Sequence, residues 1–264
     1  MQLLKNLYQI GGDLNGITWA GEDAGFRDAN SYALDLGETI VLFDCGCGDT
    51  LDQLFANMRY WGLDPGRIGW CFLTHPHLDH AGAAHLLKAK GVRLVAHPYT
   101  GAAIAAGDER CCGYLYHKTF VPTQVDDTLG DGETMTVAGL PIRALHFPGH
   151  TLGCTAWQFT HDGKRVIVSG DVIGTLNVGY FGWDGSIDFD KTKYIDSLLR
   201  FARIDFDVML SGHGMSHFYM PRRRVEECQS GIDPMALSFW AAPRVQIRNA
   251  IIKKQKRRHC DSFR

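Results

Sequence analysis

Short apolar or alternating runs separated by glycine dominate the first forty-odd residues of the chain, a pattern typical of strands. The predicted strands cover 3–10, 16–19, 31–36 and 39–44. Gly37-Glu38 between the last two runs predicts a hairpin over 34–43. The period then becomes helical over 49–61, where Leu51, Leu54 and Met58 fall on one face. A continuous apolar run over 68–73 predicts a buried strand.

The second half of the pattern repeats this order with different lengths. After the run at 68–73 come a polar, histidine-rich segment and an Ala/Leu-rich stretch that predicts one helix to about residue 90. Further strands are predicted at 94–96, 134–137, 142–147, 154–159, 166–169 and 206–210, and further helices at 98–106 and 190–201. Two strand-rich halves, each followed by helix and strand, predict an α/β protein with two packed sheets and helices outside them.

Composition and charge narrow the class of protein. The chain has 264 residues, of which 45% are hydrophobic and 21% charged, and this argues against disorder. With 27 basic and 29 acidic side chains the formal net charge is 27 − 29 = −2, which disfavours a nucleic-acid partner. No apolar stretch approaches the roughly 20 residues of a membrane helix, and the N-terminus does not resemble a signal peptide. We therefore expect a cytoplasmic protein without membrane contact, whose eight scattered cysteines are mostly buried free thiols.

The densest candidate chemistry lies directly after the strand predicted at 68–73. The segment His75-Pro-His77-Leu-Asp79-His80 places three imidazoles and a carboxylate within six positions. Buried histidine and aspartate need partners, so such a density is hard to explain by packing alone. In an extended segment His75 and His77 project to one side, and a turn at Leu78 would aim Asp79 and His80 at a second point. This arrangement has room for two metal ions.

Three more candidate ligands follow apolar strands, each beside a glycine that allows the backbone to turn sharply. They are His150, Asp171 and His213. Five histidines and two aspartates without cysteine suit zinc best, with iron, manganese or cobalt as alternatives.

With these residues the sequence resembles the metallo-β-lactamase superfamily, through HxHxDH at 75–80 and the downstream His150, Gly170-Asp171 and His213. The resemblance implies a four-layer αββα sandwich of two mixed sheets with outer helices, over a hydrolase domain of residues 1–235. The basic extension 236–264 has no assigned role. The resemblance also implies two divalent metal ions and assigns their ligands. The first ion would be held by His75, His77 and His150, the second by Asp79, His80 and His213, with Asp171 bridging both.

The expected chemistry is hydrolysis. Two cations about 3.5–4 Å apart would lower the pKa of a shared water and supply hydroxide, which attacks a carbonyl. Asp79 and Asp171 are the expected catalytic carboxylates, since Asp79 could also orient the nucleophile or pass on a proton. The predicted function is cleavage of a carboxylic ester, lactone or thioester in a small-molecule substrate. Alternatives are a phosphodiesterase or nuclease-like member, a β-lactamase-like hydrolase and a non-catalytic metal-dependent ligand sensor.

The resemblance also ranks these alternatives. β-Lactamases of this fold lack the bridging aspartate, whereas thioesterases and lactonases keep it, so Asp171 favours the latter two. A glycine-rich aromatic segment after Asp171 is the candidate substrate wall, with the irregular stretch from Cys111 to Lys118 as a second candidate. Expected substrate contacts are Tyr180, Phe181, Trp183 and His217. A homo-oligomer is left open.

Overall fold

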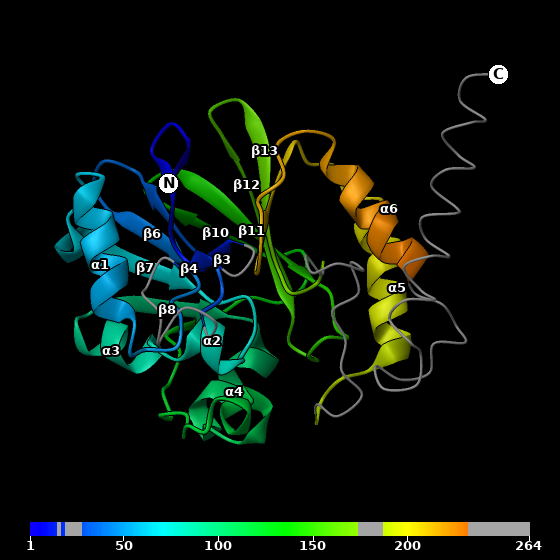
Figure 1. Cartoon of the computed structure of the whole chain (residues 1–264), viewed down its shortest axis with the longest axis horizontal. Helices are drawn as coiled ribbons and strands as arrows, with labels where there is room; N and C mark the ends of the chain where they lie inside the picture. Colours follow the sequence, from blue (N-terminus) through cyan, green and yellow to red (C-terminus); the bar gives the residue numbers. More distant parts are fainter. Residues whose placement is uncertain (15–16, 19–27, 174–186, 232–264) are drawn as a thin grey trace.

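The chain forms two facing mixed sheets with helices on their outer sides (Figure 1). The structure, a computed structural model, describes residues 1–14, 17–18, 28–173 and 187–231. The seven-stranded sheet has the order β1-β2-β5-β6-β7-β8-β9 and the five-stranded sheet the order β10-β11-β12-β13-β14. Strands β6, β7, β8 and β9 pair in parallel, as do β13 and β14, while the other pairs in both sheets are antiparallel.

The bounds of the elements are as follows. The first sheet contains β1(Gln2–Leu4), β2(Leu7–Gly11), β5(Ser31–Asp35), β6(Ile40–Phe43), β7(Ile68–Phe72), β8(Arg93–Ala96) and β9(Asp127–Thr128). The second contains β10(Thr134–Val137), β11(Leu140–His146), β12(Thr155–His161), β13(Lys164–Gly170) and β14(Val208–Ser211), and β3(Asp13–Leu14) pairs with β4(Ile17–Thr18) separately. The helices are α1(Leu51–Tyr60), α2(Leu78–Ala81), α3(Ala84–Ala89), α4(Pro98–Ala106), α5(Lys191–Phe201) and α6(Pro221–Gly231), with 3-10 turns η1(Pro65–Arg67), η2(Glu109–Cys111) and η3(Gly113–Tyr116).

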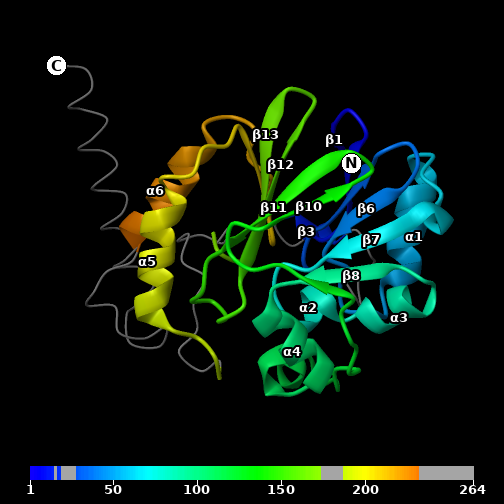
Figure 2. The ribbon, with the colours of Figure 1, turned by 180° about the vertical axis from the view of Figure 1, so that it is seen from behind.

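Alternation along the strands creates the layers. In β6, Val41 and Phe43 face the second sheet, while Ile40 and Leu42 pack toward α1 and α3 on the other side. The Phe43 ring stacks on Phe159 of β12 across the sheets, with 5.2 Å between ring centroids. The second sheet is covered in the same way by α5 and α6, which lie on the opposite side of the molecule from α1 and α3 (Figures 1 and 2). The predicted αββα sandwich is confirmed.

The helix predicted after the histidine motif is confirmed, and the structure adds a short helix before it. The Ala/Leu-rich stretch from Gly82 to about residue 90 forms α3, and at Leu78, where the sequence predicts a turn, the four-residue helix α2 begins. Ala83 N–H donates to the carbonyl of Gly46 instead of continuing the helix, and a Cβ on Gly82 would lie 2.5 Å from the carbonyl oxygen of Cys47. Close packing against the loop after β6 therefore ends α2 after one turn.

Two further expectations, the hairpin and the buried cysteines, are met within the described residues. The predicted hairpin is β5–β6, with Asp35 opposite Ile40. Seven cysteines are buried free thiols, and Cys260 lies outside the described residues. In the described part of the chain we find no helix with the length and apolar character needed to span a bilayer. The division at residues 235 and 236 also lies outside that part and stays a prediction.

Candidate metal centre

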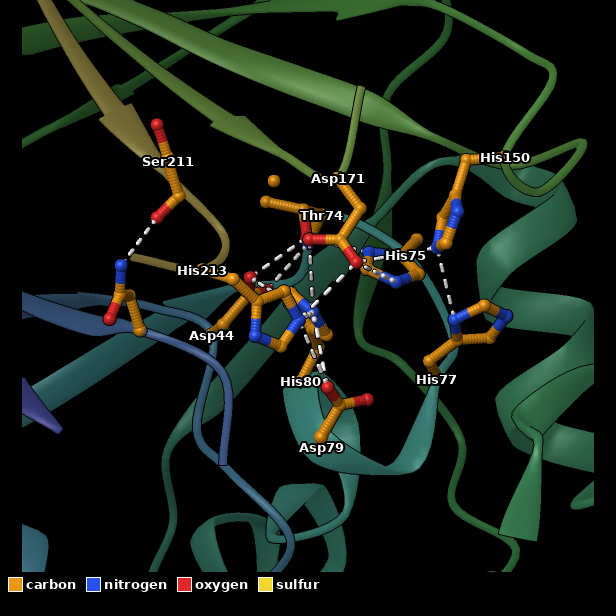
Figure 3. Close-up of polar contacts among 12 residues, drawn as sticks. Asp44, Thr74, His75, His77, Asp79, His80, His150, Asp171, Ser211 and His213 are labelled. Atoms are coloured by element: carbon orange, nitrogen blue, oxygen red, sulfur yellow. Dashed lines mark hydrogen bonds and ion pairs between the residues drawn. The ribbon is translucent and has the colours of Figure 1, made fainter. Parts of the chain in front are cut away.

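Seven histidine and aspartate side chains meet where β7, β11, β13 and β14 end (Figure 3). The structure thus brings together every ligand position expected from the sequence. Their donor atoms form three groups within which all atoms lie no more than 4.8 Å apart. The first group is His75, His77 and His150, the second group is Asp79, His80 and His213, and the third set, His75, His80 and Asp171, links these two.

Glycines beside the ligands allow the loops to approach one another. A Cβ on Gly212, next to His213, would lie 2.1 Å from an Asp171 carboxylate oxygen and 2.9 Å from Cε1 of His80. A Cβ on Gly149, next to His150, would lie 2.3 Å from Cα of Tyr194 in α5, and its φ is +150°. Only glycine fits these two positions without displacing a neighbour.

The first group is an all-imidazole cluster. Nδ1 of His77 and Nε2 of His150 lie 3.1 Å apart. Nε2 of His75 is buried and has no hydrogen-bond partner among the described residues. It lies 3.9 Å from an Asp171 oxygen, which in turn lies 3.4 Å from Nε2 of His150. Three ring nitrogens and one carboxylate oxygen therefore face a single point.

The second group combines imidazole and carboxylate. Nε2 of His213 lies 3.2 Å from Asp79 and 3.4 Å from Asp171. Nε2 of His80 lies 3.4 Å from Asp171, 3.6 Å from Asp79 and 3.4 Å from Nε2 of His213. Among the described residues, Asp171 is the one carboxylate within 4 Å of histidines from both groups, so it is placed where it could be shared by two ions.

Asp44, at the end of β6, orients histidines of both groups, and the sequence reasoning missed it. One carboxylate oxygen lies 2.8 Å from Nδ1 of His80 and accepts a hydrogen bond from the Thr74 hydroxyl, also at 2.8 Å. Because the Thr74 hydroxyl donates to Asp44, its oxygen accepts from Nδ1–H of His75, 3.0 Å away. Both rings are thereby held with a proton on Nδ1, so Nε2 is the nitrogen that each ring offers to the centre.

The protonation of the two groups differs. Burial, with a smaller contribution from neighbouring imidazoles, lowers the pKa of His77 to about 3 and lowers the pKa of His75 well below its ordinary value. These two rings are neutral at pH 7, the form in which imidazole binds a metal.

In the second group, carboxylates reverse the effect of burial. Burial alone would lower the pKa of His213, but Asp171 and Asp79 raise it to about 10. The pKa of His80 is likewise raised well above its ordinary value, mainly by Asp171 and Asp79 against burial. Burial would raise the pKa of Asp79, yet His80 and His213 lower it to about 2. Without a metal ion, protons on His80 and His213 balance the two carboxylates.

This donor set fits two divalent cations. Nε2 of His75 is buried and finds no hydrogen-bond partner among the described residues, and the paired charges of the second group are those a cation could replace. Imidazole with carboxylate is a donor set that zinc accepts, and iron and manganese also accept it.

Tyr116, at the end of η3, is a further group beside the centre. Its side chain is half-buried, and burial together with the nearby charge of Asp79 raises its pKa. The phenol is therefore protonated at neutral pH and can donate a hydrogen bond. The sequence indicated only that the stretch from Cys111 to Lys118 could form a pocket wall.

The expected substrate contacts are not placed at the centre by the described structure. Tyr180, Phe181 and Trp183 lie outside the described residues. His217 pairs through its backbone with Met209 of β14, and its ring belongs to none of the three donor groups. Its role in substrate binding stays a prediction.

With fold and site described, the class of protein follows. Residues 24–213 match the Metallo-beta-lactamase superfamily, and the chain belongs to this family. The resemblance found in the sequence is confirmed.

Individual relatives are distant. A protein of Burkholderia pseudomallei (strain 1710b) named as a probable metallo-hydrolase is 27% identical, over 78% of this chain and 71% of its own. The atrochrysone carboxyl ACP thioesterase of Passalora fulva is 25% identical over 76% of this chain and 53% of its own. Among solved structures, a metallo-β-lactamase of Cronobacter sakazakii with the motif HARLDQ superposes with a TM-score of 0.64 at 21% identity, covering 98% of each chain. At that identity the last similarity supports the fold alone.

Proposed function

We propose that this chain is a dinuclear metallo-hydrolase that cleaves a carboxylic ester, lactone or thioester, and that zinc is its metal. The observation that carries the proposal is the set of seven convergent donors, in which Asp171 lies between the two groups and Asp44 orients a histidine of each. A relative named as a metallo-hydrolase supports the hydrolytic class. The relative named as a thioesterase supports acyl chemistry, with a thioester as the first substrate to test.

His75, His77 and His150 would hold one ion, and Asp79, His80 and His213 the other, with Asp171 shared. When bound, a pair of divalent cations activates water as a nucleophile and polarises the scissile carbonyl. The protein supplies geometry and proton control. Asp79, with a pKa of about 2, is ionised at neutral pH and can accept a hydrogen bond that orients the attacking water.

Tyr116 is the proposed hydrogen-bond donor to the substrate. Its protonated phenol lies beside Asp79. From there it can donate to the negative charge that develops on the carbonyl oxygen or the leaving group. A sulfur or alkoxide leaving group needs such stabilisation, and this is consistent with an acyl substrate.

The substrate class is tested with a panel on purified full-length protein of known metal content. The substrates are p-nitrophenyl acetate, a lactone, S-lactoylglutathione, bis-p-nitrophenyl phosphate and nitrocefin. We expect turnover of at least one of the first three and none of nitrocefin. Preferential turnover of the phosphodiester would overturn the bond type, and a fully metallated protein without turnover would favour a ligand sensor.

The metal ligands are tested separately by measuring bound zinc. His77→Ala and Asp171→Ala should lose metal and activity together. His161→Gln is the matched control, because His161 lies at the β12–β13 turn, where its ring contacts the backbone of Lys5. Unchanged metal content in the first two variants would contradict the assignment.

A further inference from the structure

The carbonyl groups of the loop that carries His213 accept hydrogen bonds from the seven-stranded sheet and the segment just before its strand β5. It begins where β14 ends at Ser211 and passes through Gly212 and Gly214, and Gly214 has a φ of +70°. A buried loop of this kind needs hydrogen-bond donors for its carbonyl groups. One asparagine, directly before β5, provides most of them.

Asn30 donates to three carbonyl groups around His213. Its backbone N–H donates to the carbonyl of Gly212 at 2.6 Å, and Nδ2 donates to those of Ser211 at 3.0 Å and Gly214 at 2.9 Å. Asn30 is 1% exposed, so these bonds are shielded from water. The chain on both sides of His213 is therefore fixed by a residue more than 180 positions away.

Two neighbouring side chains fix the orientation of Asn30 and the position of the loop. Nε2 of Gln9 donates to Oδ1 of Asn30 at 2.8 Å, which directs the NH₂ of the asparagine toward the loop. The hydroxyl of Tyr32 donates to the same Ser211 carbonyl at 2.7 Å. All three side chains are buried.

The segment that contains Asn30 also contacts Asp79, another ligand of the second donor group. The N–H of Ala29 donates to the carbonyl of Asp79 at 3.2 Å. Residues 29 and 30 thus support the backbone of two of the three second-group ligands. His75, His77 and His150 lie on other loops, and neither residue has a described hydrogen bond to these three histidines.

We propose that Asn30 is a positioning residue for His213 and controls the affinity of the second metal site without affecting the first. The proposal rests on the two-metal function argued above. It follows from placement: Asn30 fixes the direction in which His213 leaves its loop, while the histidines of the first group depend on other supports. A residue that merely stabilised the fold would affect both sites alike.

The test variant is Asn30→Asp, which keeps the shape but replaces the NH₂ donor with an oxygen facing two carbonyls. Zinc binding is measured on the full chain by competition with a chromophoric chelator, and site geometry by the visible spectrum of the cobalt-substituted protein. Losing a group that orients a ligand typically costs about 10–100-fold in metal affinity. We expect that loss for the second ion only, with the first ion within about twofold of wild type.

The control is Asn57→Asp. Asn57 on α1 donates to the carbonyl of Ile10 at 2.7 Å. The control variant therefore loses a comparable amide–carbonyl hydrogen bond at a place away from the donor groups. Tyr32→Phe should weaken the second ion by a smaller factor, because it removes one of the bonds to Ser211. If Asn30→Asp does not fold, Tyr32→Phe carries the test by the same criterion.

The outcomes separate this inference from the proposed function. A wild-type chain that binds fewer than two zinc ions overturns both. A wild-type chain that binds two, with a folded Asn30→Asp variant that loses both equally or neither, overturns only the role of Asn30. Selective loss of the second ion supports it.

Discussion

The unequal protonation of the two donor groups predicts that the two zinc ions displace different numbers of protons when they bind. In the metal-free chain His75 and His77 are neutral at pH 7, whereas His213, with a pKa of about 10, is protonated. A protonated imidazole binds zinc only after it loses one of its two ring N–H protons. Raising the pH removes a competing proton from the second group, so it should tighten the second ion and leave the first nearly unchanged.

The size of the effect follows from His213. At pH 7 its proton must be removed about three pH units below its pKa, which weakens zinc binding about 1,000-fold, or about 4 kcal/mol. The affinity of the second ion should therefore rise about tenfold per pH unit between pH 7 and 9. The raised pKa of His80 adds a second displaced proton and brings the dependence toward about 100-fold per unit.

Calorimetry of the chelator-stripped chain measures these protons directly. Zinc is titrated at pH 7 in two buffers of different ionisation enthalpy, and the difference in heat gives the protons released in each step. We expect about one to two more protons in the weaker step than in the tighter one. His213→Gln should remove about one of them, and His161→Gln none. Equal release in both steps, or greater release in the tighter one, would refute the reasoning.

Three further predictions concern single groups around the centre. Asp44→Asn should lower the affinity for both zinc ions about 10–100-fold, because Asp44 orients His80 directly and His75 of the first group through Thr74. Equilibrium dialysis measures both affinities, and an effect on one ion alone would contradict the prediction. Tyr116→Phe should lower kcat by at least about tenfold at unchanged zinc content, measured on whichever substrate the panel identifies; an unchanged kcat would exclude the proposed donor. Gly212→Ala should lose the second ion and unfold at a lower temperature, since its Cβ would lie 2.1 Å from an Asp171 oxygen. A folded variant that still binds two ions would show that the loop can move to accommodate the added methyl group.

The layers of the fold could be predicted because they depend on local patterns. The apolar run Ile40–Phe43 predicts a strand, and because side chains alternate along a strand, Val41 faces one core and Leu42 the other. The ligands could be predicted because each follows an apolar strand and stands beside glycine or within the dense histidine motif. These signals need no knowledge of which strands are neighbours.

The groups that support the ligands could not be predicted in the same way. Asp44 follows a strand like many other polar residues. Its role appears only when β6 is seen paired with β7, because Thr74 after β7 then donates to Asp44. Asn30 depends on contacts with a loop more than 180 residues away. Tyr116 stands in an irregular stretch whose path no period fixes. Such partners are set by tertiary packing, so the sequence shows which residues can bind metal better than it shows what holds them in place.

The asymmetry of the centre has a consequence for activity. If the second ion must displace protons from His80 and His213, the acid side of the activity–pH profile reflects its departure instead of the titration of a catalytic group. Added zinc should then shift that side to lower pH, by about half a unit to one unit for each tenfold increase in free metal, because two to one protons are displaced per ion. A profile set by a titrating carboxylate such as Asp79, whose pKa of about 2 lies far below the working range, would stay fixed as zinc is varied. Initial rates at several buffered zinc concentrations distinguish the two, and a profile that does not move with zinc would show that proton competition at the second site does not control the reaction.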